Sequence, residues 1–490
     1  MLQSLQLKRI KQKLPKQFLV IAAVNIILIV FQLFYLDARF QYLNKEIPFW
    51  YTQPWGEAQL SPAENIWMIP LISFGVVLIG SISSIYAKAK FMRYGGEAIL
   101  GMTLVNNFIL TYSLIRIIRI SSVPFLPLVN PIFLELAFPF MLAALFVYAL
   151  TPKFISIAQE RGIITIPTHA HPGMILQEPS ARGGGILVAI TFIVLTILFV
   201  PTSKSIWGIL GAIVILAITG LADDIQNTNP FSKLKFMENP ALRLLLQAIA
   251  GIIVIVGGIK IGFINNPFNG LIYFDQTLVN IGNMQIAPYA ILITFIWIVW
   301  IINMLSWSNG VDGQYSGIVS ITAIVIAILA LRNINVDPGQ IYVSKMAVIL
   351  AGASVGLLPF NWNPSKIMWG FTATVAGLII AALSLMTQAK VSVSIMALLI
   401  PFLDAIVTVM RRIMQKRSPL KGDRGHLHHL LLERGWSVKS IAAFYWISAG
   451  ILGAVAVLAS DKALPLLVLT FAGVIALPII ALNALKLKKN

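Results

Sequence analysis

Fourteen apolar stretches separated by short polar segments constrain the fold of this chain more than any other feature of its sequence. A helix needs about 20 mostly apolar residues to cross a bilayer, and most of the stretches approach that length. With 58% apolar residues, 11% charged residues and a mean hydropathy of +0.86, the chain is predicted to be an all-α, polytopic integral membrane protein. The expected spans lie near residues 18–36, 66–87, 97–115, 132–150, 183–201, 206–222, 241–259, 288–305, 315–331, 343–358, 367–383, 391–410, 441–459 and 463–484.

The distribution of basic residues predicts the orientation of these spans. The chain has 36 Lys and Arg against 18 Asp and Glu, and 26 of the basic residues fall in alternate segments on the side of the N-terminus. Cytoplasmic loops of membrane proteins carry the excess of Lys and Arg, so both termini and these loops are predicted to be cytoplasmic. Topology thus explains the basic balance, and no nucleic-acid partner is expected. The absence of Cys excludes disulfides and thiolate metal sites.

Two adjacent carboxylates, Asp223 and Asp224, follow the apolar run 207–220 at its predicted cytoplasmic end. Ionisable groups are costly within a membrane, so the pair suggests a metal or proton site. Neighbouring side chains on a helix point in different directions. Both could therefore hold one Mg²⁺ only at a frayed helix end, or one could act as a base. The alternative is a charged helix end that marks the lipid–water boundary, and for so short a motif taken alone it is the better interpretation.

Two further polar segments are predicted on the same face. His169 and His171 precede three glycines at 183–185, which either let backbone N–H groups approach a phosphate or let helices pack closely. The segment from Asn303 to Gly313 carries amides and a carboxylate in a loop broken by glycines. It suits hydrogen bonding to a nucleotide, and the alternative is a polar turn between two spans.

A histidine-rich loop follows the carboxylate Asp404, which lies within the predicted span 391–410. Zinc is disfavoured because no Cys or Glu stands at the spacing that zinc sites use, and the flanking basic residues favour phosphate instead. A solvated basic loop is the alternative, and it is weakened because three of the five His residues gather here. The residues concerned are Arg411, Arg412, Arg424, His426, His428 and His429.

In this order and spacing, the segments resemble the polyprenyl-phosphate N-acetylhexosamine-1-phosphate transferases, which start the lipid-linked intermediates of peptidoglycan, teichoic acid and O-antigen. The similarity covers about residues 130–485, which hold eleven of the fourteen predicted spans. Residues 1–130, with three spans, form an extension of unknown role. The His-x-His-His form looks more like the N-acetylglucosamine-1-phosphate branch than the muramoyl-pentapeptide branch. The matching positions are Arg182-Gly183-Gly184, Asp223-Asp224, Asn303 with Gly310 to Gly313, Pro359 to Asn361, Pro364 to Ile367, Asp404 and His426 to His429.

The resemblance implies transfer of a sugar 1-phosphate from a UDP-sugar to undecaprenyl phosphate, with release of UMP, on the cytoplasmic face of the plasma membrane. It implies Mg²⁺, or Mn²⁺ in its place, as cofactor, and it leaves a homo-oligomer open. Asp223 and Asp224 are expected to supply base and metal contacts, and His428 is expected to join them as a catalytic residue. Substrate binding is expected from Arg182, Asn303, Asn309, Asp312, Asp404, Arg424, His426 and His429.

Several positions depart from the family pattern. Phe371 stands where the family has an Asp that ligates the metal, and Ser306 and Asn309 stand where it has a second Asn and a further Asp. Leu176 and Ala181 replace an expected His and Pro. Two hypotheses follow. The chain is a divergent transferase in which Asp404, Asp312 or water supplies the missing ligand, or it is a catalytically impaired relative that binds lipid phosphate or nucleotide sugar or assists an active enzyme.

Overall fold

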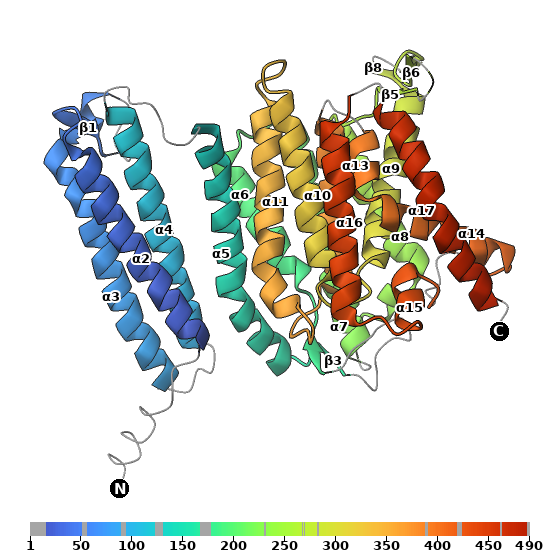
Figure 1. The fold of residues 1–490 in the computed structure, drawn as a ribbon, viewed down its shortest axis with the longest axis horizontal. Helices are drawn as coiled ribbons and strands as arrows, with labels where there is room; N and C mark the ends of the chain where they lie inside the picture. The colour runs from blue at the N-terminus through green and yellow to red at the C-terminus, as the bar shows by residue number, and fades with distance from the viewer. Residues whose placement is uncertain are drawn as a thin grey trace, which may run out of the picture. The chain divides into compact units, whose positions relative to one another are not determined.

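The structure is a computed structural model. It describes residues 16–50, 56–89, 95–122, 131–166, 178–229, 232–266, 268, 270–281, 284–387, 391–418, 424–460 and 463–487. Helices make up almost all of its regular structure, and the strands form two-stranded antiparallel pairs. The predicted all-α membrane class is therefore confirmed. The chain divides into two compact units, Met1–Ser156 and Ile157–Asn490, whose elements Figure 1 labels.

The unit Met1–Ser156 contains the helices α2 (Lys16–Phe40), α3 (Met68–Ala89) and α4 (Gly95–Ser121), together with most of α5 (Pro131–Glu160). The strands β1 (Glu46–Pro48) and β2 (Leu60–Pro62) pair between α2 and α3. Two short 3-10 helices, η1 (Glu57–Gln59) and η2 (Ala63–Trp67), flank β2. The predicted boundary near residue 130 marks where the resemblance to the transferases begins, and it stays a prediction.

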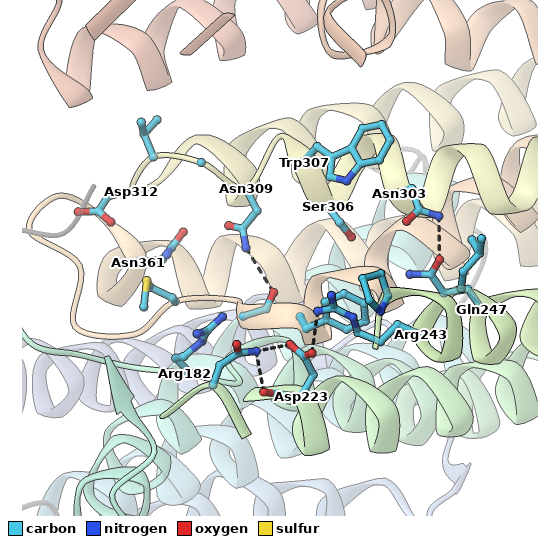
Figure 2. Close-up of a pocket in the computed structure, with 18 residues that line it drawn as sticks. Arg182, Asp223, Arg243, Gln247, Asn303, Ser306, Trp307, Asn309, Asp312 and Asn361 are labelled. Atoms are coloured by element: carbon cyan, nitrogen blue, oxygen red, sulfur yellow. Dashed lines mark hydrogen bonds and ion pairs between the residues drawn. The ribbon is translucent and has the colours of Figure 1, made fainter. Parts of the chain in front are cut away.

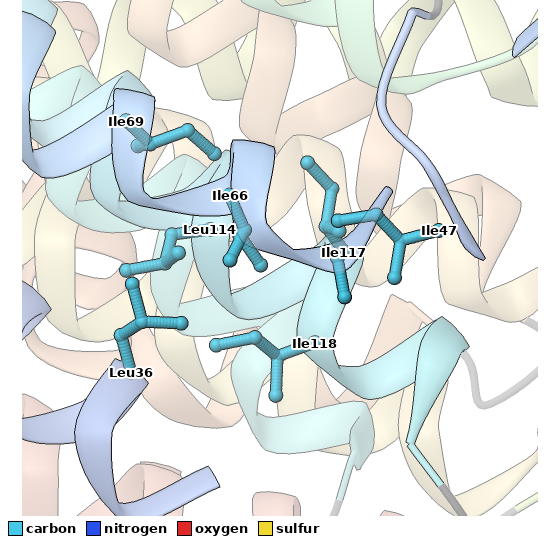
Figure 3. Packing of buried hydrophobic residues seen from close by; sticks show 8 residues of the cluster. Leu36, Ile47, Ile66, Ile69, Leu114, Ile117 and Ile118 are labelled. Carbon is cyan, nitrogen blue, oxygen red and sulfur yellow. The ribbon is translucent and has the colours of Figure 1, made fainter. Parts of the chain in front are cut away.

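Apolar side chains from α2, η2 and α4 pack together at one end of this unit (Figure 3). Leu36, Ile66 and Leu114 are fully buried there, and Ile47 of β1 joins them. Burying a side chain of this kind contributes about 1.5–3 kcal/mol relative to leaving it exposed in water. The hairpin is thus anchored to the helices by its own apolar residue.

A ladder of amide side chains connects α2 to α4 further along the two helices. Gln32 Nε2 donates to Asn107 Oδ1 at 2.9 Å and to Thr111 Oγ1 at 2.7 Å, and Asn107 Nδ2 donates to the main-chain oxygen of Asn25 at 2.9 Å. Hydrogen bonds between membrane helices average about 0.6 kcal/mol each. Their main effect is therefore to fix the register of α2 against α4.

The unit Ile157–Asn490 holds the residues for which a function is predicted. Four short hairpin strands (β5 to β8) lie at one end of this unit, and β3 and α15 lie at the other (Figure 1). Its elements are β3 (Ile164–Thr165), β4 (Ser180–Ala181), α6 (Gly185–Phe199), α7 (Lys204–Thr228), η4 (Lys235–Glu238), α8 (Pro240–Val256), β5 (Phe263–Asn265), β6 (Leu271–Tyr273), β7 (Val279–Ile281), β8 (Met284–Ile286), α9 (Pro288–Trp307), α10 (Gln314–Arg332), α11 (Gln340–Asn361), η5 (Gly370–Ala373), α12 (Thr374–Met386), α13 (Val391–Ala397), α14 (Leu399–Met414), α15 (Leu427–Leu432), α16 (Val438–Leu458) and α17 (Leu464–Leu487).

Helices α10 and α11 form the centre of this unit. In the most apolar windows of these helices, 78% and 72% of the residues are buried, against 17% for α17. α10 begins after Gly313, which has a φ of 77° and so adopts a left-handed conformation that glycine takes without strain. Trp446 of α16 donates to the main-chain oxygens of Gly313 and Gln314, both at 3.2 Å, and thereby holds this turn.

In the part of the chain that the structure describes, ten of the predicted spans are helices that are long and apolar enough to cross a membrane. An eleventh, predicted at 391–410, is a pair of helices, α13 and α14, bent by 85°. Pro401 explains the bend, because it lacks an N–H group and its ring clashes with the carbonyl of Ala397 four residues earlier. The other three predicted spans correspond to the shorter helices Gly185–Phe199, Pro240–Val256 and Gly370–Met386. The count of fourteen spans therefore stays a prediction.

The segment 366–373, between α11 and α12, packs against β4 and α6. Ala181 N donates to Lys366 O at 3.1 Å, and Met368 N returns a bond to Ala181 O at 2.8 Å. Gly184 N donates to Met368 O at 2.9 Å, and Gly185 N donates to Trp369 O at 3.4 Å. These two N–H groups are therefore already satisfied by the protein. Of the two interpretations of the glycine run, these bonds support close packing at Gly184 and Gly185, and phosphate binding by the run stays a prediction.

Glycines also let Thr372 approach two helices. A Cβ atom added to Gly185 would lie 2.6 Å from Thr372 O, and one added to Gly220 of α7 would lie 2.7 Å from Thr372 N and Cα. Real Cβ atoms do not come so close to a backbone. The segment 366–373 thus reaches its place only because these two positions lack a side chain.

Substituting Gly220→Ala should therefore destabilise the protein, because the new methyl group meets the backbone of Thr372 and overpacking of this kind costs about 1–3 kcal/mol. Gly211→Ala on the same helix is the matched control. Its Cβ would have its nearest neighbour, Ile253 Cγ2, at 3.8 Å, and alanine favours a helix over glycine by about 1 kcal/mol. Thermal unfolding in detergent should show a lower midpoint for the first variant only, and equal midpoints would contradict the packing described here.

Candidate functional site

A cavity of about 310 Å³ lies where the end of α7, the start of α8 and the loop between α9 and α10 meet (Figure 2). The last residue of α11, Asn361, and the segment 368–371 complete its wall. Volumes of this size suit small-molecule ligands. The lining includes five residues for which a function is predicted, Arg182, Asp223, Asn303, Asn309 and Asp312, together with the divergent positions Ser306 and Phe371.

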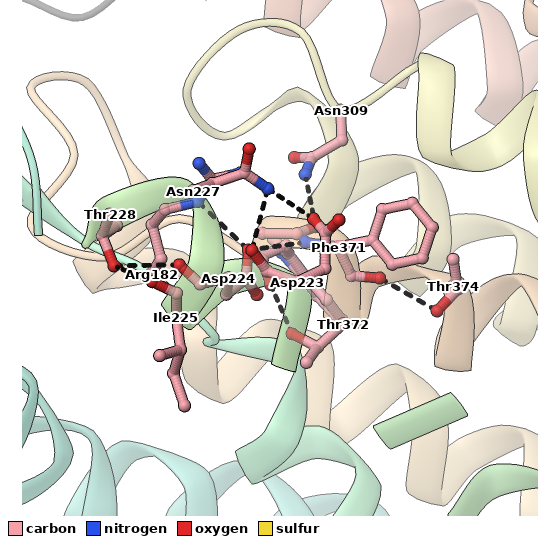
Figure 4. Close-up of polar contacts among 12 residues, drawn as sticks. Arg182, Asp223, Asp224, Ile225, Asn227, Thr228, Asn309, Phe371, Thr372 and Thr374 are labelled. Carbon is pink, nitrogen blue, oxygen red and sulfur yellow. Dashed lines mark hydrogen bonds and ion pairs between the residues drawn. The ribbon is translucent and has the colours of Figure 1, made fainter. Parts of the chain in front are cut away.

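Asp223 faces this cavity from the last turns of α7. Its Oδ1 accepts a hydrogen bond from Arg243 Nη1 at 2.8 Å, and its Oδ2 accepts one from Asn227 Nδ2 at 2.6 Å (Figure 4 shows Asn227 beside it). Arg243 stands in the first turn of α8, and its side chain is 25% exposed. An ion pair therefore links α7 to α8 at the cavity wall.

Asp224 is not among the residues that line the cavity, and it contacts two other segments (Figure 4). Its Oδ1 lies 3.1 Å from Arg182 Nε and accepts a hydrogen bond from Phe371 N at 2.9 Å. Gly370, with a φ of 66°, packs against the carboxylate so closely that a Cβ there would lie 2.1 Å from Asp224 Oδ2. The two adjacent Asp residues thus bind two different arginines, as their different directions on a helix require.

The ring of Phe371 lies under the guanidinium group of Arg243, with 5.2 Å between Cζ and the ring centroid. This distance is within the range of a cation–π interaction, which contributes about 0.5–2 kcal/mol. Both residues line the cavity. An aromatic ring and an arginine therefore stand together at the position where the family pattern has a carboxylate.

The end of α9 and the loop after it present amide groups to the cavity. Asn303 Nδ2 donates to Gln247 Oε1 at 2.7 Å, and Asn309 Nδ2 donates to Gly370 O at 3.4 Å. Asp312 Oδ2 accepts from Asn363 Nδ2 at 2.9 Å and from a backbone N–H at 3.1 Å. Burial raises the pKa of the Asp312 carboxyl, and these hydrogen bonds offset part of that rise. These hydrogen bonds hold the loop in place, and the amide side chains of Asn303 and Asn309 remain in the cavity wall.

The predicted histidines form a buried cluster next to this loop. His426 Nδ1 lies 3.0 Å from Asp404 Oδ2, and Asp404 Oδ1 accepts from Leu427 N at 2.8 Å. The ring of Trp307, which lines the cavity, lies 6.0 Å from that of His426. His428 and His429 are also buried, whereas Arg424 is exposed. The cavity lining includes neither Asp404 nor Arg424 nor any of the three histidines, so their substrate contacts stay predictions.

His428 packs against the backbone of Gly310, where a Cβ would lie 2.0 Å from its Nε2. Burial first, and then the neighbouring rings of His429 and His426, lower the pKa of the His428 imidazole well below its usual range. A neutral ring is therefore expected at pH 7. This contact couples the histidine cluster to the cavity loop, because only glycine at 310 lets the ring approach.

The residues present do not fit the metal site that the resemblance implies. Mg²⁺ needs near-octahedral oxygen ligands at about 2.1 Å, yet no group of three or more His, Asp or Glu in the described residues is placed to hold an ion. The carboxylate oxygens at 223 hold Arg243 and Asn227, and Asp224 is enclosed. Of the suggested replacement ligands, Asp404 is engaged with His426 and Leu427 N, and Asp312 fixes the segment 363–365.

Two residues of this site were not predicted from the sequence. Arg243 contributes to the sequence analysis only as one of the basic residues that predict the orientation of the spans, and Gln247 has no predicted role. Both lie on α8, four residues apart and so on one face of the helix. Two polar side chains at that spacing in the first turns of an otherwise apolar helix were the signal that could have identified them.

Comparison with known proteins identifies the class of protein that this chain resembles. Residues 206–388 match the family model described as glycosyl transferase family 4, and the resemblance read from the motifs is confirmed.

Particular relatives extend the match to most of the chain. A probable undecaprenyl-phosphate N-acetylglucosaminyl 1-phosphate transferase of Bacillus subtilis is 25% identical over 317 residues, which cover 63% of this chain and 80% of that protein. A decaprenyl-phosphate N-acetylglucosaminephosphotransferase of Mycolicibacterium smegmatis is 26% identical over 72% of this chain and 89% of its own length. A phospho-N-acetylmuramoyl-pentapeptide-transferase of Chloroherpeton thalassium is 23% identical over 69% and 95%, respectively.

The two ion pairs should differ in their effect on stability. Asp224→Asn leaves Arg182, whose side chain is 8% exposed, without its compensating charge, and should lower the free energy of unfolding by about 3 kcal/mol. Asp223→Asn should cost less than about 1 kcal/mol, because water reaches Arg243. Denaturation in detergent measures both, and equal losses would show that burial of the arginine does not decide the outcome.

Acidification should destabilise the protein through His428. The unfolded chain binds a proton at the usual pKa of about 6.5, whereas the folded chain resists it, so stability is complete above that pH and falls below it. His428→Gln should reduce the loss in unfolding midpoint between pH 7 and pH 5 compared with the native chain. The same loss in both proteins would mean that another group causes the pH dependence.

Proposed function

We propose that this chain transfers a sugar 1-phosphate, of the N-acetylhexosamine class, from a UDP-sugar to a polyprenyl phosphate in the synthesis of cell-envelope polysaccharides. The observation that carries the proposal is one cavity in which a carboxylate, two arginines and an amide-lined loop meet. All of the described residues that line this cavity except Arg182 lie within the part of the chain that matches the model of glycosyl transferase family 4. Relatives named for transfer of N-acetylglucosamine phosphate to prenyl phosphates support the same reaction.

In the proposed reaction, an oxygen of the lipid phosphate forms a bond to the β-phosphorus of the UDP-sugar. The bond from that phosphorus to the bridging oxygen breaks, and UMP leaves with the electron pair. The lipid then carries a diphosphate bound to the sugar. Most of the catalysis in such a transfer comes from positioning and from stabilising negative charge, because little covalent chemistry falls to the protein.

The roles follow from where the side chains lie. Asp223 faces the cavity, so it is the carboxylate that could accept a proton from the lipid phosphate, while Asp224 positions Arg182 and the segment around Phe371. Arg182 and Arg243 supply positive charge for phosphate oxygens. The amides Asn303 and Asn309 suit hydrogen bonding to the nucleotide.

The membrane setting of the reaction is part of the proposal. The excess of basic residues supports a cytoplasmic position of these loops and both termini at the plasma membrane. The lipid phosphate would reach the cavity from that leaflet. Mg²⁺ belongs in the assay because the resemblance implies it, but no step is assigned to it here, because the described residues do not form its site.

The direct test is release of UMP by the purified full-length protein given undecaprenyl phosphate, MgCl₂ and either UDP-N-acetylglucosamine or UDP-N-acetylgalactosamine. Asp223→Asn should lower the rate by about 100-fold, the smaller end of the range for loss of a general base. Lys204→Gln is the matched control, because it removes a charge at the other end of α7, roughly 28 Å along the helix from Asp223.

Failure of the native chain to release UMP with either donor would contradict the transferase proposal. If Phe371→Asp then gained activity, the second hypothesis would hold, and the native chain would be an impaired relative. Equal rates in the native chain and Asp223→Asn would remove the proposed role of that carboxylate while leaving the reaction in place.

A further inference from the structure

The charged groups of the cavity are balanced before any substrate arrives. Among the described residues that line it, the charged ones are Arg182, Arg243, Asp223 and Asp312. A site that holds a divalent cation gathers carboxylates in excess, so that the ion has ligands. Here the lining has as many arginines as carboxylates, and the neighbouring carboxylate, Asp224, is enclosed against Arg182. The positive charge that an entering diphosphate would meet is therefore that of the arginines.

Arg243 is the better exposed of the two cations. Its side chain is 25% exposed, against 8% for Arg182, and it lines the cavity directly. One of its five N–H donors, on Nη1, bonds to Asp223 Oδ1. The guanidinium group is planar and permanently charged, and its donors form a fork that matches phosphate oxygens in pairs.

Phe371 holds this guanidinium group without using its donors. The ring attracts the charge from 5.2 Å and has no oxygen that would accept the N–H groups as a carboxylate does. A carboxylate at the same position would instead accept one or two of those N–H groups, and it would add a negative charge beside the incoming phosphates. The aromatic residue therefore suits an arginine that binds an anion.

We propose that Arg243, held between Asp223 and the ring of Phe371, takes the place of a divalent cation at this cavity, so that the chain binds the diphosphate of its nucleotide-sugar donor without a metal ion. This inference rests on the proposed function. It deepens that function by assigning the charge that neutralises the donor to a side chain rather than to Mg²⁺.

The test is calorimetric binding of UDP-N-acetylglucosamine to the full-length protein, once with MgCl₂ and once with excess EDTA. The dissociation constants should agree within about twofold. A weakening in EDTA of about tenfold or more, which corresponds to 1.4 kcal/mol, would overturn the inference. This comparison uses the native chain, so it does not depend on how any variant folds.

Variants separate the guanidinium group from the ring. Arg243→Gln should weaken binding by about tenfold or more in both buffers, since a charge-assisted hydrogen bond to phosphate is lost, whereas Lys204→Gln should bind as the native chain does. Phe371→Leu should weaken binding without creating a metal requirement. Phe371→Asp should create one, seen as tighter binding with MgCl₂ than with EDTA and as binding of Mn²⁺ measured by electron paramagnetic resonance.

The outcomes distinguish this inference from the proposed function. Native UMP release that requires MgCl₂ and stops in EDTA overturns the inference and leaves the transferase proposal standing. Mn²⁺ bound by the native chain as tightly as by Phe371→Asp also overturns it. Absence of both donor binding and UMP release in either buffer overturns both proposals. Release of UMP in EDTA at a rate within about twofold of that in MgCl₂ supports both, since twofold is well under the 1.4 kcal/mol of a tenfold effect.

Discussion

The ion pair between Asp224 and Arg182 is the contact on which the candidate site depends. It joins three segments that are far apart in the sequence, because Asp224 lies in the last turns of a long apolar helix, Arg182 follows β4, and the same carboxylate accepts the backbone N–H of Phe371. Asp224 and Arg182 are both buried, so each would be costly without its partner. The carboxylate at 224 therefore acts mainly by placing the wall of the cavity, and Asp223 is left to face what enters it.

The fold class and the positions of the long apolar helices that the structure describes could be predicted from the sequence, because hydropathy reports burial in lipid directly. What hydropathy does not report is whether an apolar helix spans. Pro401 bends the predicted span 391–410, and Gly185–Phe199 is too short at 15 residues, roughly 22 Å, for a hydrocarbon layer of about 30 Å. The motifs likewise identified most of the cavity wall, since Asn303, Asn309 and Asp312 lie close together in the sequence, near the end of a helix and in the loop that follows.

The roles of the glycine run and of Arg243 depend on contacts between residues that are far apart in the sequence. The glycines at 183–185 were compatible with a phosphate cradle or with packing, and what favours packing is the segment 366–373, some 185 residues later, which accepts the N–H groups of Gly184 and Gly185. Arg243 appeared as an ordinary loop cation because neither of its partners, Asp223 and Phe371, is a neighbour in the sequence. A pattern read along one chain cannot show such pairings.

Phe371 and Arg243 are best understood as one physical arrangement rather than as two separate departures from a metal-binding pattern. A phenylalanine alone would remove an oxygen ligand without supplying a charge in its place. An arginine beside a metal-binding carboxylate would compete with the metal ion for that carboxylate. Together, the ring supports the guanidinium group, Asp223 orients it, and the cation remains at the cavity wall. Position 371 thus lacks a metal ligand, and position 243 supplies a fixed positive charge. Both changes favour binding of a diphosphate by the guanidinium group.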